Sequence, residues 1–420
     1  MATPLKFLHS SDWHLDRPLS GLSGIPDHLR ETLVEAPWQA AANLFDRALA
    51  EQVDFLLLSG DIVDLEQGGP RAVAFLMSRF ERLAERGIHV YWCSGSVDHP
   101  DRLPGPVCWP DNVTLFVAAG MAAVVHCDGD RPVATICGCG RQAKKRSGQD
   151  FSCEPDAVFP IALAHGELEA GGLASSNIRY WALGGKHQRT VAASSGAPVI
   201  YPGTPQARDP GQSGKHSCTL VTVSADGKPE TAELEVDTVR WLSPRLTVSE
   251  NASADDLRAS LADRCLRIQS QTADRLTLVN WEIATSGKFN PQLRDGQAQA
   301  SLLAWLREEF GKSTTGLWTG QLTIEPPVSL PAEWQEEDTI LGDYLRALGP
   351  LQADPASGLA LDRWLGPRAG RDEVLSELVR IPAATREAIL RQVALTGIEY
   401  LAGRDSGGSA ETTGPGQPVA

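Results

Sequence analysis

The chain has 420 residues, 42% of them hydrophobic, which is enough for a large buried core and is typical of two or three domains. Its formal net charge of -15 argues against a uniformly basic surface that coats nucleic acid, but it is compatible with nucleic acid held in a cleft. No apolar stretch approaches the roughly 20 residues that span a bilayer, and no signal peptide precedes the first strand-like run, so we expect a cytoplasmic protein without membrane contact.

Residues 1–235 alternate strand-like and helix-like segments, which is the pattern of a layered α/β domain. Apolar runs at 5–8 and 55–58 predict two buried strands. A helix is predicted from Pro70, because its apolar residues fall on one face as far as Leu83 and Gly87 stands where the helix would end. Residues 88–92 predict the next strand.

Polar residues directly follow these strand-like runs. Asp12 and His14 follow the first run, Asp61 follows the second, and His165 and His187 come after later ones. Because ligands usually bind at the carboxyl ends of strands in an α/β sheet, the five side chains are expected to meet there. Carboxylate oxygen and imidazole nitrogen together suit Mn, Fe or Zn. Taken alone, however, this D-x-H spacing is weak evidence, because it also suits a helix N-cap or turn residue at Asp12 and a buried structural histidine at His14.

Eight cysteines occur without any C-x-x-C pair, and several lie in apolar runs. Free cysteine behaves as a small hydrophobic residue, and disulfides are rare in the cytoplasm. We therefore expect free thiols packed in the core, in preference to disulfides or a zinc cluster.

The second half of the chain contains smaller elements. Two helices and two strands are expected there, at 253–261, 302–310, 276–283 and 318–324. They predict a small α/β accessory domain over residues 236–330. Residues 331–402 predict helices broken at Gly349-Pro350, Pro355 and Pro367, with an apolar stripe that packs internally or on a partner helix. The composition of residues 403–420, rich in Gly, Ser, Thr and Pro, predicts a disordered tail.

With these motifs in order, the chain resembles the calcineurin-like metallophosphoesterases, and among them the SbcD/YhaO-type DNA-repair exonucleases of bacteria. The motifs are D-W-H at 12–14, G-D-I-V-D at 60–64, G-S-V-D at 95–98, A-H-G at 164–166, G-G-K-H at 184–187 and Y-P-G-T at 201–204. The likeness covers residues 1 to about 220 well and the accessory domain only in general layout. It implies a metallophosphoesterase β-sandwich flanked by helices, with a small capping domain and C-terminal helices.

Two of these motifs depart from the family pattern. Ser96 and Val97 stand where the family has the asparagine that ligates the second metal and the histidine that assists the leaving group. Gly185 stands where the family has another second-metal histidine. The resemblance therefore implies a first metal held by Asp12, His14, Asp61 and His187, and a second site reduced to Asp61, His165 and the weak ligand Ser96. We expect one divalent transition ion, Mn with Fe or Zn as alternatives, a weak or absent second ion, and reduced activity.

Two residues are candidates for replacing what is missing. His99, displaced by two positions from the family's histidine, would reach the same phosphate if its loop were rebuilt, although Pro100 restricts its backbone. Lys186 would place an ammonium where the charge of the second metal is missing. For both residues the alternative is an ordinary surface role.

The resemblance implies a metal-dependent phosphodiesterase that acts on DNA ends, with His165 on the substrate side. It also implies an SbcC-type coiled-coil ATPase as partner, with a homodimer as a further option. The first alternative is a non-catalytic scaffold that binds DNA or the ATPase, and the second is a phosphatase for small phosphoesters or phosphoproteins. The fold alone does not separate these functions, since one fold serves many substrates.

Overall fold

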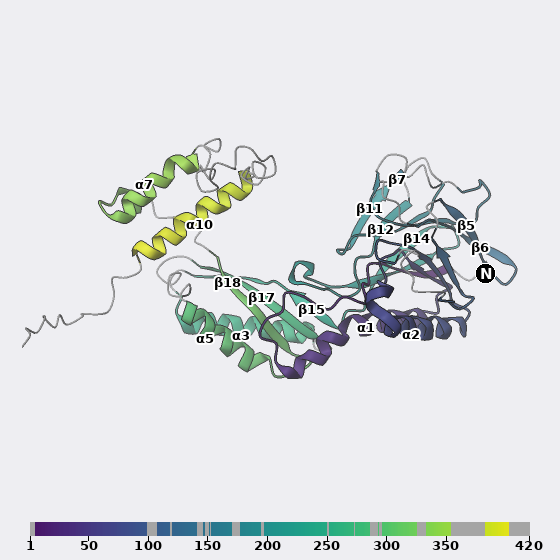
Figure 1. Ribbon diagram of the computed structural model, residues 1–420, viewed down its shortest axis with the longest axis horizontal. Coiled ribbons are helices and arrows are strands. Elements are labelled where there is room, and N and C mark those ends of the chain that lie inside the picture. The colour runs from purple at the N-terminus through teal and green to yellow at the C-terminus, as the bar shows by residue number, and fades with distance from the viewer. Residues whose placement is uncertain are drawn as a thin grey trace, which may run out of the picture. The chain divides into compact units, whose positions relative to one another are not determined.

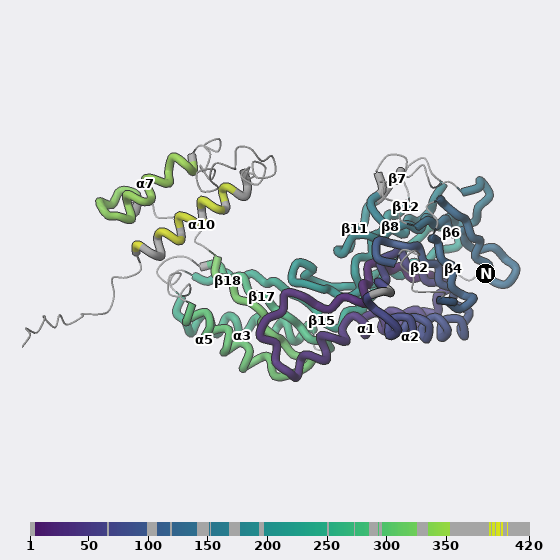
Figure 2. Tube along the Cα trace, viewed as in Figure 1, coloured from purple at the N-terminus to yellow at the C-terminus, as the bar shows by residue number. Residues whose placement is uncertain are grey.

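A computed structural model places most of the chain (Figure 1, Figure 2). It describes residues 5–98, 107–117, 120–140, 146–147, 151, 153–169, 177–194, 197–249, 252–272, 274–285, 293, 296–325, 333–353 and 383–402. The chain divides into two compact units, the first made of residues 1–244, 262–281 and 303–321, the second of the remainder. The expected domain boundaries at 235, 330 and 402 remain predictions. His99, Pro100, Pro355, Pro367 and the tail from 403 lie outside the described residues.

The first unit contains a six-stranded sheet in the order β14-β13-β1-β2-β3-β4. Its strands are β14 (Pro229–Glu235), β13 (Ser217–Val223), β1 (Leu5–Ser10), β2 (Phe55–Leu58), β3 (His89–Cys93) and β4 (Val113–Phe116). Strands β1 to β4 are parallel, whereas β13 is antiparallel to β1. In β2, Phe55 and Leu57 pack in one core cluster and Leu56 and Leu58 in another. The run is continuously apolar because both faces of this parallel sheet are buried.

Helices α1 (Asp27–Ala50) and α2 (Leu65–Ala84) pack on the outer face of this sheet (Figure 1). The helix that we expected from Pro70 is present. It follows a kink at Gly69, whose φ of 58° only glycine adopts easily, and a short helical segment from Leu65 precedes that kink. The kink lies directly before Pro70, where a proline would clash with a regular helix.

A second six-stranded sheet, of order β11-β12-β10-β8-β6-β5, packs on the inner face of the first. Its strands are β11 (Thr190–Ser194), β12 (Ala197–Tyr201), β10 (Tyr180–Gly184), β8 (Pro160–His165), β6 (Arg131–Gly138) and β5 (Ala122–Asp128). Phe7, Phe55 and Tyr91 from the first sheet meet Ile161 and Tyr180 from the second in one core. The short strands β7 (Arg146–Ser147) and β9 (Leu168–Glu169) pair separately. The expected fold class, a layered α/β protein with sheets flanked by helices, is confirmed.

One cysteine pair corrects our expectation of free thiols. Cys137, at the end of β6, and Cys153 form a disulfide, with their Cα atoms 7.0 Å apart. The other six cysteines are free, and four of them are buried as expected. Spacing in the sequence does not show which two sulfur atoms meet.

The accessory elements form a smaller sheet of order β15-β17-β16, in which β18 also pairs with β17. Its elements are β15 (Val239–Leu242), β16 (Arg245–Val248), β17 (Leu276–Thr285), β18 (Leu317–Ile324), α3 (Ala254–Gln271) and α5 (Gly296–Phe310). All four expected elements are present. Helix α3 opens with the expected cap, since Ser253 Oγ accepts the N–H of Asp256 and the Asp256 carboxylate accepts the N–H of Ser253.

In the second unit, α6 (Glu333–Glu336), α7 (Ile340–Ala353) and α10 (Ala383–Ala402) form the C-terminal helices. The hydroxyl of Tyr344 in α7 donates to the carbonyl oxygen of Val393 in α10 at 2.6 Å. The break expected at Gly349-Pro350 is wrong, because α7 continues through Pro350 to Ala353. Only three residues follow this proline, so its clash is confined to the last turn. No helix within the described ranges is long and apolar enough to cross a membrane.

Candidate metal centre

The loops after β1 and β2 are joined at the carboxyl ends of these parallel strands. The N–H of Asp12 donates to the carbonyl oxygen of Gly60, and the N–H of His14 donates to that of Asp61, both at 3.0 Å. The backbone φ is positive at three residues of these loops: 56° at Asp12, 45° at His14 and 56° at Asp61. Residues other than glycine adopt this region only at an energetic cost. Such strain clusters at functional sites, where surrounding structure holds it in place.

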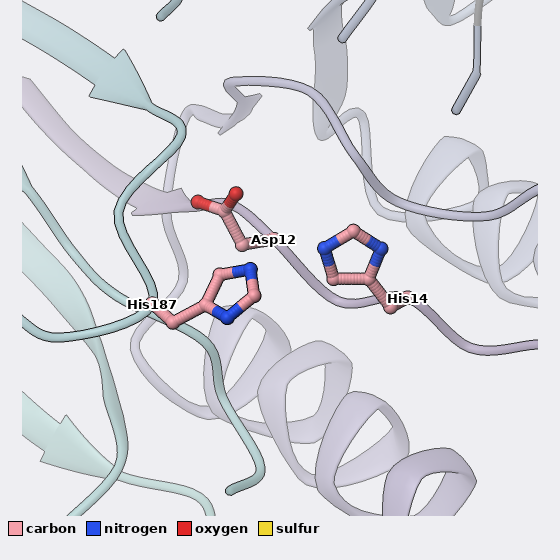
Figure 3. A group of neighbouring side chains, drawn as sticks. All are labelled: Asp12, His14 and His187. Atoms are coloured by element: carbon pink, nitrogen blue, oxygen red, sulfur yellow. The ribbon is translucent and has the colours of Figure 1, made fainter. Parts of the chain in front are cut away.

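Two groups of potential ligand atoms lie at this edge of the sheets. Atoms of Asp12, His14 and His187 are all within 4.8 Å of one another, and so are atoms of Asp12, Asp61 and His165. Figure 3 shows the first group, with Asp12 and His14 on the loop after β1 and His187 on the loop after β10. The structure thus brings together all five side chains that the sequence singled out. Their role as metal ligands remains a prediction.

His14 gives the best test of whether these residues fit a metal ion. Its side chain is buried, with 3% of the residue exposed, and neither ring nitrogen has a hydrogen-bond partner among the described residues. Nε2 lies 3.8 Å from Asp61 Oδ2. Burial lowers the pKa of His14 to about 4, against the opposing charge of Asp61, so the ring is neutral. A buried neutral imidazole without partners is costly unless something binds it, and a divalent ion fits.

Asp12 is held from two sides. Its Oδ2 accepts the hydroxyl of Ser11 at 2.6 Å and the N–H of Gly185 at 2.9 Å. Burial raises the pKa of Asp12, while the charge of His165 acts in the opposite direction. The two donors orient the carboxylate of Asp12, which belongs to both groups of potential ligand atoms.

Asp61 and His165 form the other half of the centre. His165 Nδ1–H donates to the carbonyl oxygen of Ser59 at 2.8 Å, which turns Nε2 toward Asp61 Oδ2 at 3.4 Å. Burial lowers the pKa of His165, but the hydrogen bond and charge of Asp61 outweigh it and raise the pKa to about 9. Burial acts to raise the pKa of Asp61, yet His165 and the N–H of Val97 hold it below its usual range. A metal ion at this pair would have to displace a proton from His165.

At the three positions that depart from the family pattern, Ser96, Val97 and Gly185, the main chain determines the local contacts. The N–H groups of Ser96 and Val97 both donate to Asp61 Oδ1, the second at 3.0 Å, so Ser96 contacts this carboxylate through its main chain. Gly185 has a φ of 100°, and a Cβ there would lie 3.2 Å from the Cα of Gly166. A side chain at position 185 would therefore be strained as well as crowded.

His187 is partly exposed, and Gln212 orients it. The Gln212 amide is fixed, because its Oε1 accepts the N–H of Arg208 at 2.8 Å and its Nε2 donates to Asp209 Oδ2 at 3.1 Å. The same Nε2 lies 3.0 Å from His187 Nδ1, which must then accept, so that the neutral ring carries its proton on Nε2. Ligation through Nε2 would require the Gln212 amide to turn over. No motif in the sequence pointed to Gln212.

Asp98 is a second residue to which the sequence assigned no role. It is 7% exposed and accepts hydrogen bonds from the N–H groups of Asp61, Ile62 and Gly95 and from Trp92 Nε1. Burial raises the pKa of Asp98 above its usual value. Its position at the end of G-S-V-D was the available signal. Asp98 therefore holds the Asp61 loop in place.

Replacing Asp98 with alanine should destabilise the protein by about 3 kcal/mol, because four buried donors lose a charged acceptor. Urea unfolding followed by circular dichroism measures the change. Asp98→Asn, which keeps one carbonyl oxygen, should lose less. Equal stability of Asp98→Ala and the parent would contradict this role.

Asp64, which follows Asp61 in the same motif, lies outside both groups of ligand atoms. Its N–H donates to Asp16 Oδ1 at 2.8 Å, and its Oδ2 accepts from the Gln67 amide at 3.2 Å. These contacts fit a residue that shapes the loop. His99, which we considered as a substitute for the missing family histidine, lies outside the described residues.

Known proteins match this chain in three comparisons. The family model described as calcineurin-like phosphoesterase matches residues 5–182. The metallophosphoesterase YhaO of Bacillus subtilis is 30% identical over 331 residues, which cover 73% of this chain and 81% of that protein. A dimetal phosphatase from Danio rerio has a TM-score of 0.32 at 11% identity, covering 56% of this chain and 99% of its own. Vps29 from Cryptosporidium parvum has a TM-score of 0.28 at 14% identity, covering 56% and 100%.

Proposed function

The chain belongs to the calcineurin-like metallophosphoesterase family, and on that premise we propose that it cleaves phosphodiester bonds at DNA ends. The observation that carries the proposal is His14, a buried imidazole with two unpartnered nitrogens beside Asp12 and Asp61. Phosphoester hydrolysis with divalent metal is the family's chemistry. The choice of DNA ends as substrate rests on the resemblance to the repair exonucleases.

We assign Asp12, His14 and Asp61 as the residues that would hold the ion, with His187 as the fourth ligand if the Gln212 amide turns. Manganese suits this mixed set of oxygen and nitrogen donors, with iron or zinc as alternatives. A bound ion would polarise the phosphate and favour deprotonation of the attacking water. We assign His165, which the Ser59 carbonyl orients, to the substrate side, where it would donate from Nε2.

Phosphodiesterase activity should be low, because the half of the centre around Ser96 and Val97 lacks a side-chain metal ligand and a side-chain proton donor. Val97 can neither donate nor accept a proton through its side chain, and general acid–base help is typically worth about 10²–10⁴-fold. A second ion would find Asp61, His165 and an Asp12 already shared with the first group, while Ser96 is engaged through its backbone.

Incubating the protein with end-labelled duplex DNA and Mn²⁺ tests the proposal. Slow, metal-dependent shortening of the DNA is expected, and none with EDTA or in His14→Ala. Metal analysis of the protein dialysed against Mn²⁺ should give one tightly held ion per chain. Cleavage that is equal in His14→Ala would show a contaminating nuclease and refute the assignment.

A second candidate is a scaffold that keeps the fold without hydrolysis. The strained backbone at Gly185 and the main-chain role of Ser96 favour it, since neither residue brings a side-chain ligand to the second metal position. The scaffold predicts DNA or partner binding that survives in His14→Ala together with no cleavage by the parent protein.

The coiled-coil ATPase implied by the resemblance would be the partner in either case. Helices α7 and α10 expose Ile340, Ile389 and Val393, which are suitable for packing against another helix. A homodimer would have the same surface available.

A further inference from the structure

Lys186 is fixed at both ends by residues of the centre. The preceding Gly185 donates its N–H to Asp12 Oδ2 at 2.9 Å, and the following His187 ring lies 3.0 Å from the Gln212 amide. A Cβ on Gly185 would lie 3.4 Å from His165 Nε2. The backbone of Lys186 therefore begins beside His165, on the side of the centre where second-metal ligands are missing.

The ammonium of Lys186 is also placed by an aromatic ring. Nζ lies 4.4 Å from the centroid of the Tyr201 ring, a cation–π distance. Tyr201 is only 6% exposed, and its hydroxyl lies 3.5 Å from the carbonyl oxygen of Gly166, which directly follows His165. The ring thus keeps the lysine side chain near the His165 side of the centre.

The charge of Lys186 is not neutralised within the part of the chain that the structure describes. No carboxylate there lies within ion-pair distance of its Nζ. The flexible four-carbon stem of the lysine lets the ammonium move several ångströms at little cost. A cation–π contact is weaker than a charge-assisted hydrogen bond to phosphate, so an incoming phosphate can draw Nζ away from the ring.

We propose that Lys186 binds a non-bridging oxygen of the substrate phosphate, which places one positive charge where Ser96 and Gly185 supply no side-chain ligand to the second metal position. This inference rests on the proposed phosphoesterase function and deepens it. It assigns the site to phosphate groups held by one metal ion and one ammonium, whereas a dimetal centre holds them between two ions. Lys186 would contact the substrate directly.

Binding of inorganic phosphate to the Mn²⁺-loaded protein, measured by calorimetry, tests the inference without any turnover. Lys186→Met keeps most of the unbranched side chain and removes its charge, and it should weaken phosphate binding by about tenfold or more, the loss of one charge-assisted hydrogen bond. Lys186→Arg should stay within about threefold of the parent, since it keeps the charge. The bound Mn²⁺ should be unchanged in both.

Lys228→Met is the matched control, because it removes an exposed lysine from the turn between β13 and β14. It should bind phosphate as the parent does. If Lys186→Met binds phosphate as tightly as Lys228→Met does, the inference is wrong and Lys186 merely packs on Tyr201. Equal losses in Lys186→Met and Lys186→Arg would also refute it, because they would show a steric role.

DNA experiments separate this inference from the proposed substrate. Removing one phosphate contact should reduce the slope of log affinity against log salt for duplex DNA by about 0.9, an effect that packing alone would not produce. If phosphate binding depends on Lys186 but the parent never cleaves DNA, Lys186 stands and the nuclease assignment fails. If DNA is cleaved equally well by Lys186→Met, the inference about Lys186 fails and the nuclease assignment stands.

Discussion

Replacing Asp61 with alanine is expected to reduce phosphodiester hydrolysis by at least about 10³-fold, the loss of a group on which the whole charge-stabilising site depends. Asp61 Oδ2 lies 3.4 Å from His165 Nε2 and 3.8 Å from His14 Nε2, so this one carboxylate faces both halves of the centre. Its Oδ1 is held by the N–H groups of Ser96 and Val97. Removing it would withdraw a proposed metal ligand and release the loop that follows β3.

The effect should appear in two measurements, the initial rate of Mn²⁺-dependent cleavage and the number of ions bound per chain. Asp61→Asn keeps the shape of the side chain and one oxygen acceptor, and it should still lose most activity because the negative charge is gone. Asp54→Ala is the control, since Asp54 precedes the opposite end of β2 and accepts the N–H of Lys6 there. If Asp61→Ala kept more than a tenth of the activity while Asp54→Ala kept all of it, the shared role of Asp61 would be excluded.

The double substitution Ser96→Asn and Val97→His is expected to increase activity by about 10²–10⁴-fold, the usual worth of general acid–base assistance. The backbone of both positions is already held against Asp61 Oδ1, so the new side chains start from a fixed loop. Asparagine would add an oxygen ligand for a second ion, and histidine would add a proton donor for the leaving group. Bound Mn²⁺ should rise from one ion toward two per chain.

A higher cleavage rate without a second bound ion would assign the gain to Val97→His alone. If neither the cleavage rate nor the number of bound ions rises, the second metal site cannot be rebuilt by these two substitutions. Gly185→His is the contrasting variant. It introduces the histidine that the family has at this position. However, the φ of 100° and the close approach to Gly166 should make the substitution destabilising by about 1–2 kcal/mol. It should therefore lower the urea midpoint and leave activity no higher than the parent's.

The local sequence was sufficient for most of the fold. The run Phe55 to Leu58 predicted a strand buried on both faces, because alternate residues point to opposite sides and all four are apolar. Ser253 and Asp256 likewise predicted the start of α3, since capping depends on residues only three apart. Where the prediction failed, at Pro350, the outcome depended on how few residues follow the proline in α7.

For the candidate site, the sequence by itself determined which side chains meet. Asp12, His14, Asp61, His165 and His187 follow strands whose carboxyl ends lie at one edge, and strand order and polarity bring such residues together. Tertiary structure alone decided how each one is held: Ser59 lies 106 positions from the His165 that it orients, and Gln212 lies 25 from His187. The Cys137–Cys153 pairing and the placement of Lys186 over Tyr201 were decided in the same way. Hydrogen bonds, disulfides and ring contacts require atoms to meet within a few ångströms, and only the packed chain brings distant segments that close.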